Sequence, residues 1–263
     1  MPSNFVAKGA DGYEAIMGRW SRRLATPFLD FAGVPDHGSV LDAGCGTGSL
    51  TLALAARSEL TAIEALDFDA DFVAALRSRT VDPRIRVQKG DVCALPYEDA
   101  VFDRVYSLLV LHFVSDAHRA VQEMRRVLRP GAVAAATVWD TYGGMPSWRL
   151  FWDTVRALEA DATNAIPRKR PMTGEGELRI AFESAGFKEI AQTMLTIRMD
   201  YANFDDFWLP MVYGQGTFGS FFDALPEARR DRLRSAVRTA YLAGDPDGPR
   251  GFASVAWAVK GTA

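Results

Sequence analysis

A chain of 263 residues with 48% hydrophobic and 24% charged residues has the composition of one ordinary folded domain. Its formal net charge is −3, and no apolar run approaches the ~20 residues that span a bilayer, so we expect neither a nucleic-acid nor a membrane partner. Cys45 and Cys93 give no disulfide framework or metal-ligand spacing, and residues 1–12 lack a secretory signal pattern. These features predict a metal-free protein of the reduced cytoplasm.

An amphipathic helix is predicted over residues 13–31, because apolar residues recur there every three or four positions. This helix either packs against an edge of the sheet or closes over a bound ligand. In the second case Tyr13, Arg19 and Trp20 are the side chains that face the ligand.

From residue 39 onward, apolar strand patterns alternate with helical ones, which predicts parallel strands joined by crossover helices. Strands are expected at 39–42, 61–66, 85–88, 101–109 and 132–139, and helices at 49–57, 69–79 and 116–128. Asp69 is a candidate N-cap, as is Ser115 or Asp116 for the last of these helices. That helix should stop at Arg129-Pro130-Gly131, because proline cannot continue it.

After residue 139 the alternation changes. Helices are expected at 146–160 and 177–185, a strand at 187–198, two helical stretches within 203–245 around the aromatic segment 213–222, and a final strand at 251–259. The basic link 167–171 is either a polyanion contact or, as is commoner for three charges in a loop, solvated.

The most informative stretch is a glycine-rich loop, in which an apolar run ends at Asp42 and Gly44, Gly46 and Gly48 follow at alternate positions. Such glycines let a ligand lie directly against the backbone, and the helix that follows directs its free N–H groups to the same place. Dinucleotide-binding folds use G-x-G-x-x-G, but here Ser49 occupies the third glycine position.

The segment Leu41–Gly48 resembles the first motif of the class I S-adenosylmethionine-dependent methyltransferases. Further segments resemble that family in the same order, over residues 38–140: Ala65–Asp69, Lys89–Tyr97, Phe102–Ser107 and Val127–Gly131. Tyr13-Glu14 with Gly18–Ser21, and Ser184–Phe187, are similar to the small-molecule branch of menaquinone and ubiquinone biosynthesis.

The resemblance implies an α/β fold, with a Rossmann-like seven-stranded, mostly parallel sheet, helices on both faces and an antiparallel last strand. It implies one methyltransferase domain over residues 1–263. Within it we expect an N-terminal helical cap segment at 1–37, a cofactor-binding core at 38–140, and helical insertions at 141–175 and 200–248 that form a substrate cap.

The methyl donor implied is S-adenosylmethionine, with S-adenosylhomocysteine as product. Asp42 suits the amino-acid end, Asp67 the ribose hydroxyls and Asp91 the adenine amino group. The full set of expected cofactor-binding residues adds the adenine sandwich, the methionine contacts and the helix 13–31: Tyr13, Arg19, Trp20, Asp42, Gly44, Cys45, Gly46, Gly48, Asp67, Phe68, Asp91, Val92, Ser107 and Leu108. Cys45 is interpreted as a small filler of the loop, because no base is placed beside it.

Methyl transfer is an in-line displacement that depends mainly on orientation and exclusion of water, and it requires a base only when the nucleophile must lose a proton. His112 is the first candidate base because it follows the fourth strand, with Asp140 and Tyr142 next; a buried structural histidine is the alternative. An acceptor pocket is predicted from aromatic residues, which alternatively build a helical core: Trp148, Trp152, Trp208, Tyr213, Phe218 and Phe222.

The sequence therefore predicts an S-adenosylmethionine-dependent methyltransferase that acts on a small, apolar or aromatic molecule. Two alternatives stay open. A nucleotide-dependent oxidoreductase would bind NAD(P), whereas a non-catalytic cofactor-binding protein would never release S-adenosylhomocysteine. The acceptor atom (O, N, C or S) and the choice between monomer and homodimer are left open by the sequence.

Overall fold

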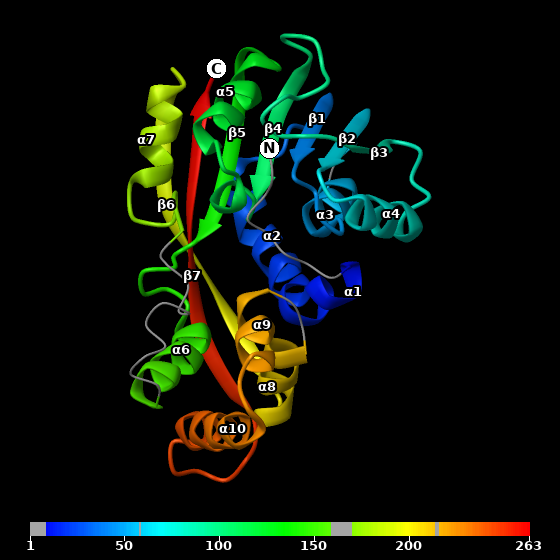
Figure 1. The fold of residues 1–263 in the computed structure, drawn as a ribbon. Coiled ribbons are helices and arrows are strands. Elements are labelled where there is room, and N and C mark those ends of the chain that lie inside the picture. The colour runs from blue at the N-terminus through cyan, green and yellow to red at the C-terminus, as the bar shows by residue number, and fades with distance from the viewer. Residues whose placement is uncertain (1–8, 58, 159–169, 214–215) are drawn as a thin grey trace.

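One seven-stranded sheet organises the computed structural model, which describes residues 9–57, 59–158, 170–213 and 216–263 (Figure 1). Its strands are β1 (Ser39–Ala43), β2 (Ala62–Asp67), β3 (Ile85–Lys89), β4 (Phe102–Leu108), β5 (Leu128–Trp139), β6 (Lys188–Tyr201) and β7 (Arg250–Thr262). They lie in the order β3-β2-β1-β4-β5-β7-β6. The first five pair in parallel, and β7 pairs antiparallel with both β5 and β6. This confirms the predicted mostly parallel sheet with an antiparallel last strand.

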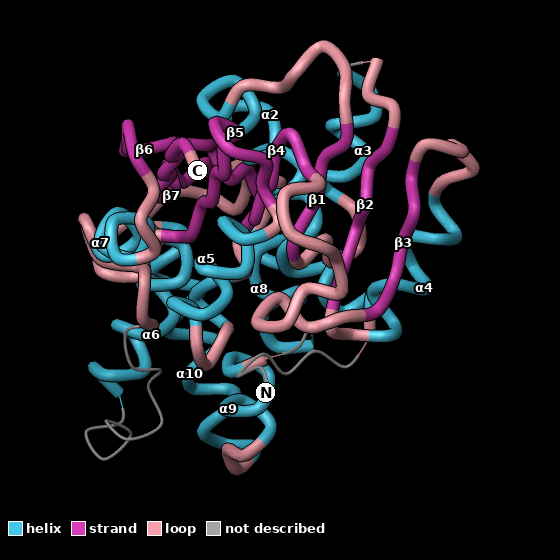
Figure 2. Tube along the Cα trace, turned by 90° about the horizontal axis from the view of Figure 1, so that it is seen from above, coloured by secondary structure: helices cyan, strands magenta, loops and turns pink. Residues whose placement is uncertain are grey.

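Helices cover both faces of the sheet, as expected for parallel strands that must be buried on both sides (Figure 2). The crossover helices are α3 (Ser49–Arg57), α4 (Ala70–Arg79), α5 (Ala117–Arg126) and α7 (Glu177–Ser184). One apolar core includes residues of α3 and of α2 (Arg19–Ala32), whereas a second includes residues of α5 and α7. The sequence-predicted N-caps form here: the Asp69 side chain accepts N–H bonds at the start of α4, and Asp116, not Ser115, caps α5.

The N-terminal helix is one continuous segment of three parts, α1 (Ala10–Tyr13), the π-helical turn η1 (Glu14–Gly18) and α2. Trp20, Leu24 and Phe28 are buried in the first core. The helix therefore packs on the sheet through α2, as one of the two sequence interpretations expected, while α1 contacts α4 at the far end.

Four helices gather at the end of the β6–β7 ribbon that projects beyond the parallel strands (Figure 1). They are α6 (Pro146–Leu158), α8 (Phe204–Tyr213), α9 (Thr217–Asp223) and α10 (Glu227–Leu242). Residues 203–245 thus contain three helices rather than the two expected. Gly216 starts α9 at a positive φ of 90°, so α8 and α9 separate where the sequence suggested only an aromatic, glycine-rich connection. No helix of the described residues is long and apolar enough to cross a membrane.

The boundary between α5 and β5 differs from the prediction. The helix ends at Arg126 and the strand begins at Leu128, so Arg129–Gly131, expected to be a loop, lie within β5. Leu128 pairs with Phe102, after which the register shifts before the pair Arg104–Val133. Proline is tolerated in a strand at such an irregularity, because no ladder N–H is required there.

Candidate active site

A cavity of about 240 Å³ opens where the chain leaves β1, β2, β3 and β4. It is lined by Tyr13, Gly44, Gly46, Asp67, Phe68, Asp69, Phe72, Asp91, Val92, Cys93, Leu108, Leu109, Val110, Phe113, Val114 and Ser115. The carboxyl ends of adjacent parallel strands meet at one edge of a sheet, which is where open α/β folds bind ligands. Eight of the residues proposed to bind a cofactor therefore come together here: Tyr13, Gly44, Gly46, Asp67, Phe68, Asp91, Val92 and Leu108.

Two glycines of the glycine loop, Gly44 and Gly46, line the cavity with their backbone. Gly44 has a φ of 86°, and a Cβ at this position would collide with Val110, so any larger residue would be both strained and crowded. The backbone N–H groups of Gly44 and Cys45 donate to the Leu66 carbonyl, at 2.8 and 2.9 Å. These bonds fix the loop against the end of β2.

Asp67 links the glycine loop to the start of α4. Its Oδ2 accepts from the Gly46 N–H at 2.8 Å and its Oδ1 from the Asp69 N–H at 2.9 Å. Burial raises the pKa of this carboxyl, although these N–H donors oppose the shift. Each oxygen keeps a second lone pair, so the carboxylate is oriented by the backbone and can still accept from two hydroxyl groups of a ligand.

Asp42 is fully buried at the end of β1, two residues before Gly44. Its Oδ2 accepts from the Thr51 hydroxyl at 2.6 Å, whereas its Oδ1 has no partner among the described residues. Burial raises the pKa of Asp42 to about 7, and the charge of Asp67 acts in the same direction. A buried carboxylate oxygen without a donor is costly, so this position fits the ammonium group of an amino-acid ligand.

Asp91, Val92 and Phe68 lie at the ends of β3 and β2 beside the cavity. The Asp91 Oδ1 accepts from the Cys93 N–H at 2.8 Å. Phe68 is 50% exposed and Val92 also lines the cavity, so a flat ligand can reach both side chains. These contacts suit a purine base between two apolar groups, with a carboxylate at its edge.

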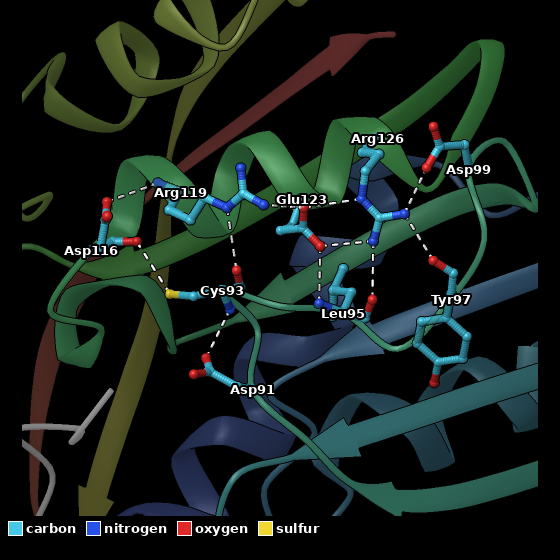
Figure 3. Close-up of polar contacts among 9 residues, drawn as sticks. All are labelled: Asp91, Cys93, Leu95, Tyr97, Asp99, Asp116, Arg119, Glu123 and Arg126. Atoms are coloured by element: carbon cyan, nitrogen blue, oxygen red, sulfur yellow. Dashed lines mark hydrogen bonds and ion pairs between the residues drawn. The ribbon is translucent and has the colours of Figure 1, made fainter.

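The loop that carries Asp91 and Val92 is clamped by side chains of α5 (Figure 3). Glu123 is buried and accepts from the Leu95 N–H at 3.0 Å. Arg126 donates to Glu123 at 2.7 Å, to the Leu95 carbonyl at 2.9 Å and to the Tyr97 carbonyl at 2.8 Å. The sequence reasoning missed this clamp, although a glutamate and an arginine three residues apart on a predicted helix were its visible signal.

Glu14, which the sequence analysis named only as part of a motif and gave no role at the site, also lies beside the cavity. Its carboxylate accepts from the Thr47 hydroxyl of the glycine loop and pairs with Arg79 of α4 at 2.7 Å. These partners hold the Glu14 pKa below its usual range, although burial opposes the shift. Glu14 therefore fastens the N-terminal helix beside the cavity, where Tyr13 forms part of the lining.

Arg19 and Trp20, the other residues proposed from this helix, lie outside the cavity lining. Arg19 pairs with Asp206 of α8 at 2.9 Å, and Trp20 packs against Tyr201. The helical rotation explains this, because positions six and seven residues after Tyr13 reach β6 and α8 instead of the glycine loop. Four further proposed residues, Asp42, Cys45, Gly48 and Ser107, also lie outside the lining. Within the loop the Gly48 N–H donates to the Cys45 carbonyl at 2.9 Å, and the Ser107 hydroxyl donates to the Ala43 carbonyl at 3.0 Å. Burial raises the pKa of the Cys45 thiol, so it is not an activated nucleophile.

The candidate bases lie at the ends of β4 and β5. His112, in the short 3₁₀ helix η2 (Leu111–Phe113), is buried, and burial with the nearby charge of Arg170 lowers its pKa to about 3. Its Nδ1 has no partner among the described residues. Asp140 accepts N–H bonds from Tyr142 and Gly143, and the Tyr142 hydroxyl lies 3.3 Å from Glu177. A histidine with so low a pKa is neutral but weakly basic, and none of these three lines the cavity.

Five of the six aromatic residues proposed for an acceptor pocket pack against one another around the β6–β7 ribbon. Phe218 contacts Trp148 at 5.5 Å and Trp152 at 5.1 Å between ring centroids, and Phe222 contacts Trp208 at 5.3 Å. Tyr213 is 75% exposed. None of the six lines the cavity, because each buried ring fills space between the helices.

Of the basic link 167–171, residues 167–169 lie outside the described residues.

Comparison with known proteins agrees with this geometry. Residues 41–136 match the methyltransferase domain family. The chain is 31% identical over 193 residues to the malonyl-[acyl-carrier protein] O-methyltransferase of Geobacter sulfurreducens, covering 68% of this chain and 66% of that protein. It is 39% identical to the demethylmenaquinone methyltransferase of Shouchella clausii over 35% of this chain and 41% of that protein. The chain spans about half the length of the curated relatives it matches.

Among solved structures, the YcgJ protein of Bacillus subtilis has a TM-score of 0.58 and 16% identity, covering 91% of this chain and 97% of that one. The fold is therefore the Rossmann-like fold of methyltransferases. Together with the matched domain, this places the chain in a family: it belongs to the class I S-adenosylmethionine-dependent methyltransferases.

Proposed function

We propose that this protein transfers a methyl group from S-adenosylmethionine to a small acceptor with an apolar or aromatic part. The observation that supports this most directly is that Asp67 and Asp91 line one cavity with the glycines of the loop, while the carboxyl of Asp42 is buried in β1 two residues before Gly44. The cofactor supplies a methyl group on a positively charged sulfur. The protein contributes binding, orientation and exclusion of water.

Each carboxylate has a separate part in this proposal. Asp42, with its unpartnered Oδ1, holds the ammonium group, and Asp67 accepts from the two ribose hydroxyls. Asp91 accepts from the adenine amino group, with Phe68 and Val92 on either side of the ring. Leu108, Leu109 and Phe113 then form an apolar wall from which water is excluded.

The names of the relatives support a small acceptor group, because they give demethylmenaquinone in one case and a malonyl group carried on acyl-carrier protein in another. The comparisons offer no support for an NAD(P)-dependent oxidoreductase. A general base is not required by this proposal, and the low pKa of His112 argues against that residue in the role.

Calorimetry with S-adenosylhomocysteine tests the donor site. We expect Asp67→Ala to weaken binding by about 1.5–3 kcal/mol, because a charged acceptor of two hydroxyls is lost. Asp71→Ala removes an exposed aspartate four residues away and should bind like the wild type. Equal affinities of Asp67→Ala and wild type would refute the placement, and wild-type binding of NADH but not of S-adenosylhomocysteine would refute the proposed function.

A further inference from the structure

The positive charge of Arg170, beside the cavity-lining Phe113, has no carboxylate partner in the part of the chain that the structure describes. Arg170 is half-buried, and its guanidinium carbon lies 4.3 Å from the centre of the Phe113 ring. Burial lowers its pKa, and no acid among the described residues opposes the shift. Two other arginines that lie over aromatic rings are different: Arg19 pairs with Asp206 and Arg23 with Asp200.

The position of Arg170 relates it to the cavity. Phe113 lines the cavity directly and follows β4. The segment that begins at Arg170 lies against the turn after β5, where the Thr173 and Thr141 hydroxyls are 2.6 Å apart. Arg170 does not line the cavity itself, but it packs on Phe113, which does, beside the segment that follows β5. The carboxyl ends of parallel strands are where open α/β folds bind ligands, so a ligand that extends from the cavity past Phe113 can reach the guanidinium.

The neighbouring histidine supplies no negative charge. His112 contacts Phe113 with 4.1 Å between ring centroids, and it is neutral because its pKa is about 3. Its Nδ1 also lacks a partner among the described residues. Phe113 thus lies against two polar side chains, the Arg170 guanidinium and the His112 ring.

A partly desolvated guanidinium without a counter-charge is unfavourable, and a ligand anion removes that cost. The planar guanidinium donates two parallel N–H bonds to a carboxylate or phosphate group, and this geometry is selective for such groups. We propose that Arg170 binds an acidic group of the methyl acceptor. The acceptor is then a small molecule that carries a carboxylate or phosphate beside an apolar or aromatic part packed on Phe113. This inference rests on the proposed function, since it specifies the substrate class of the same site.

The test uses the full-length protein saturated with S-adenosylhomocysteine and three related probes: 2-naphthoate, 2-naphthyl phosphate and the uncharged 2-naphthamide. By calorimetry, we expect one of the acids to bind at least tenfold more tightly than the amide. Whichever of the two acids binds more tightly shows whether Arg170 recognises a carboxylate or a phosphate group. In Arg170→Gln this preference should disappear, while the affinity for S-adenosylhomocysteine stays that of the wild type.

Arg179→Gln is the matched control, because it removes the same charge from the exposed surface of α7 and should keep the preference. Arg170→Lys keeps the positive charge but loses the two parallel N–H donors of the guanidinium, so it should retain only part of the preference for the acids. The inference is overturned if the amide binds as well as both acids in the wild type, or if Arg170→Gln keeps the preference. Failure of S-adenosylhomocysteine to bind the wild type would instead reject the proposed function.

Discussion

Asp42 combines complete burial, an unpartnered oxygen and a pKa of about 7. Below that pH the carboxyl is protonated, and above it the carboxylate attracts a cation. If Asp42 holds the ammonium group, ligand binding lowers its pKa, so affinity must rise as the pH rises through 7 and level off above it. Between pH 6 and pH 8 we expect S-adenosylhomocysteine to bind about tenfold more tightly.

Calorimetry at both pH values measures this dependence, and the proton released on binding at pH 6 provides a second readout. Asp42→Asn cannot ionise, so its affinity should vary little over the same interval. An equally steep dependence in that variant would assign the titration to another group.

At the scale of single residues, two of the three predicted strand-end carboxylates lie at the cavity, whereas the buried Asp42 does not line it. Asp67 and Asp91 both line the cavity, because a residue that directly follows a parallel strand has little freedom in where it lies. The lack of a partner for the His112 Nδ1 among the described residues, and the cation beside this histidine, could not be predicted. Arg170 is 58 residues away in the sequence, and only the tertiary fold brings the two together.

At the scale of elements, α5 fixes the loop that carries Asp91 although it contributes nothing to the cavity lining. We expect Arg126→Gln to weaken S-adenosylhomocysteine binding by about 1 kcal/mol, or about fivefold, because the Leu95 and Tyr97 carbonyls lose a charged donor and the loop loosens. Arg125→Gln, the adjacent exposed arginine on the same helix, should leave the affinity unchanged.

Both variants are compared well below their melting temperatures, so that folded protein alone is titrated. In the methylation reaction, the KM for the cofactor should rise with little change in kcat, as expected for a residue that positions a binding loop. A lowered melting temperature with unchanged affinity would make the role of Arg126 purely structural.

Element types were predicted better than element ends. The alternating core of strands and helices is correct because its hydrophobic periodicity is strong, and Asp69 and Asp116 cap their helices as their side-chain chemistry suggests. The start of β5 was misplaced because Pro130 is usually a terminator. Pro130 can lie inside β5 because the pairing register between β5 and β4 shifts there, and local sequence does not reveal this shift.

At the scale of the whole molecule, the aromatic residues of α6, α8 and α9 form a packing unit outside the cavity lining, although they share one apolar core with Leu108 and Leu109, which line it. Trp208 is 1% exposed, so we expect Trp208→Ala to reduce the free energy of unfolding by about 3–5 kcal/mol. Tyr213→Ala, on the same helix but exposed, should change it by less than about 0.5 kcal/mol.

Chemical denaturation measures both changes, and the affinity of each folded variant for S-adenosylhomocysteine should equal that of the wild type. A large loss of affinity in Trp208→Ala would connect this unit to the donor site.

The sequence could not separate aromatic residues of the core from aromatic residues of a pocket. Both uses require large apolar side chains, and only the packing partners differ.

The position of β7 has a consequence for how the protein is made. This strand contains residues 250–262, yet it lies between β5 and β6 and pairs with both. During synthesis, β6 emerges from the ribosome before the strand to which it bonds, and the sheet closes only after the last strand is complete. A prematurely terminated chain would therefore leave two strand edges unpaired, and exposed edges of this kind promote aggregation.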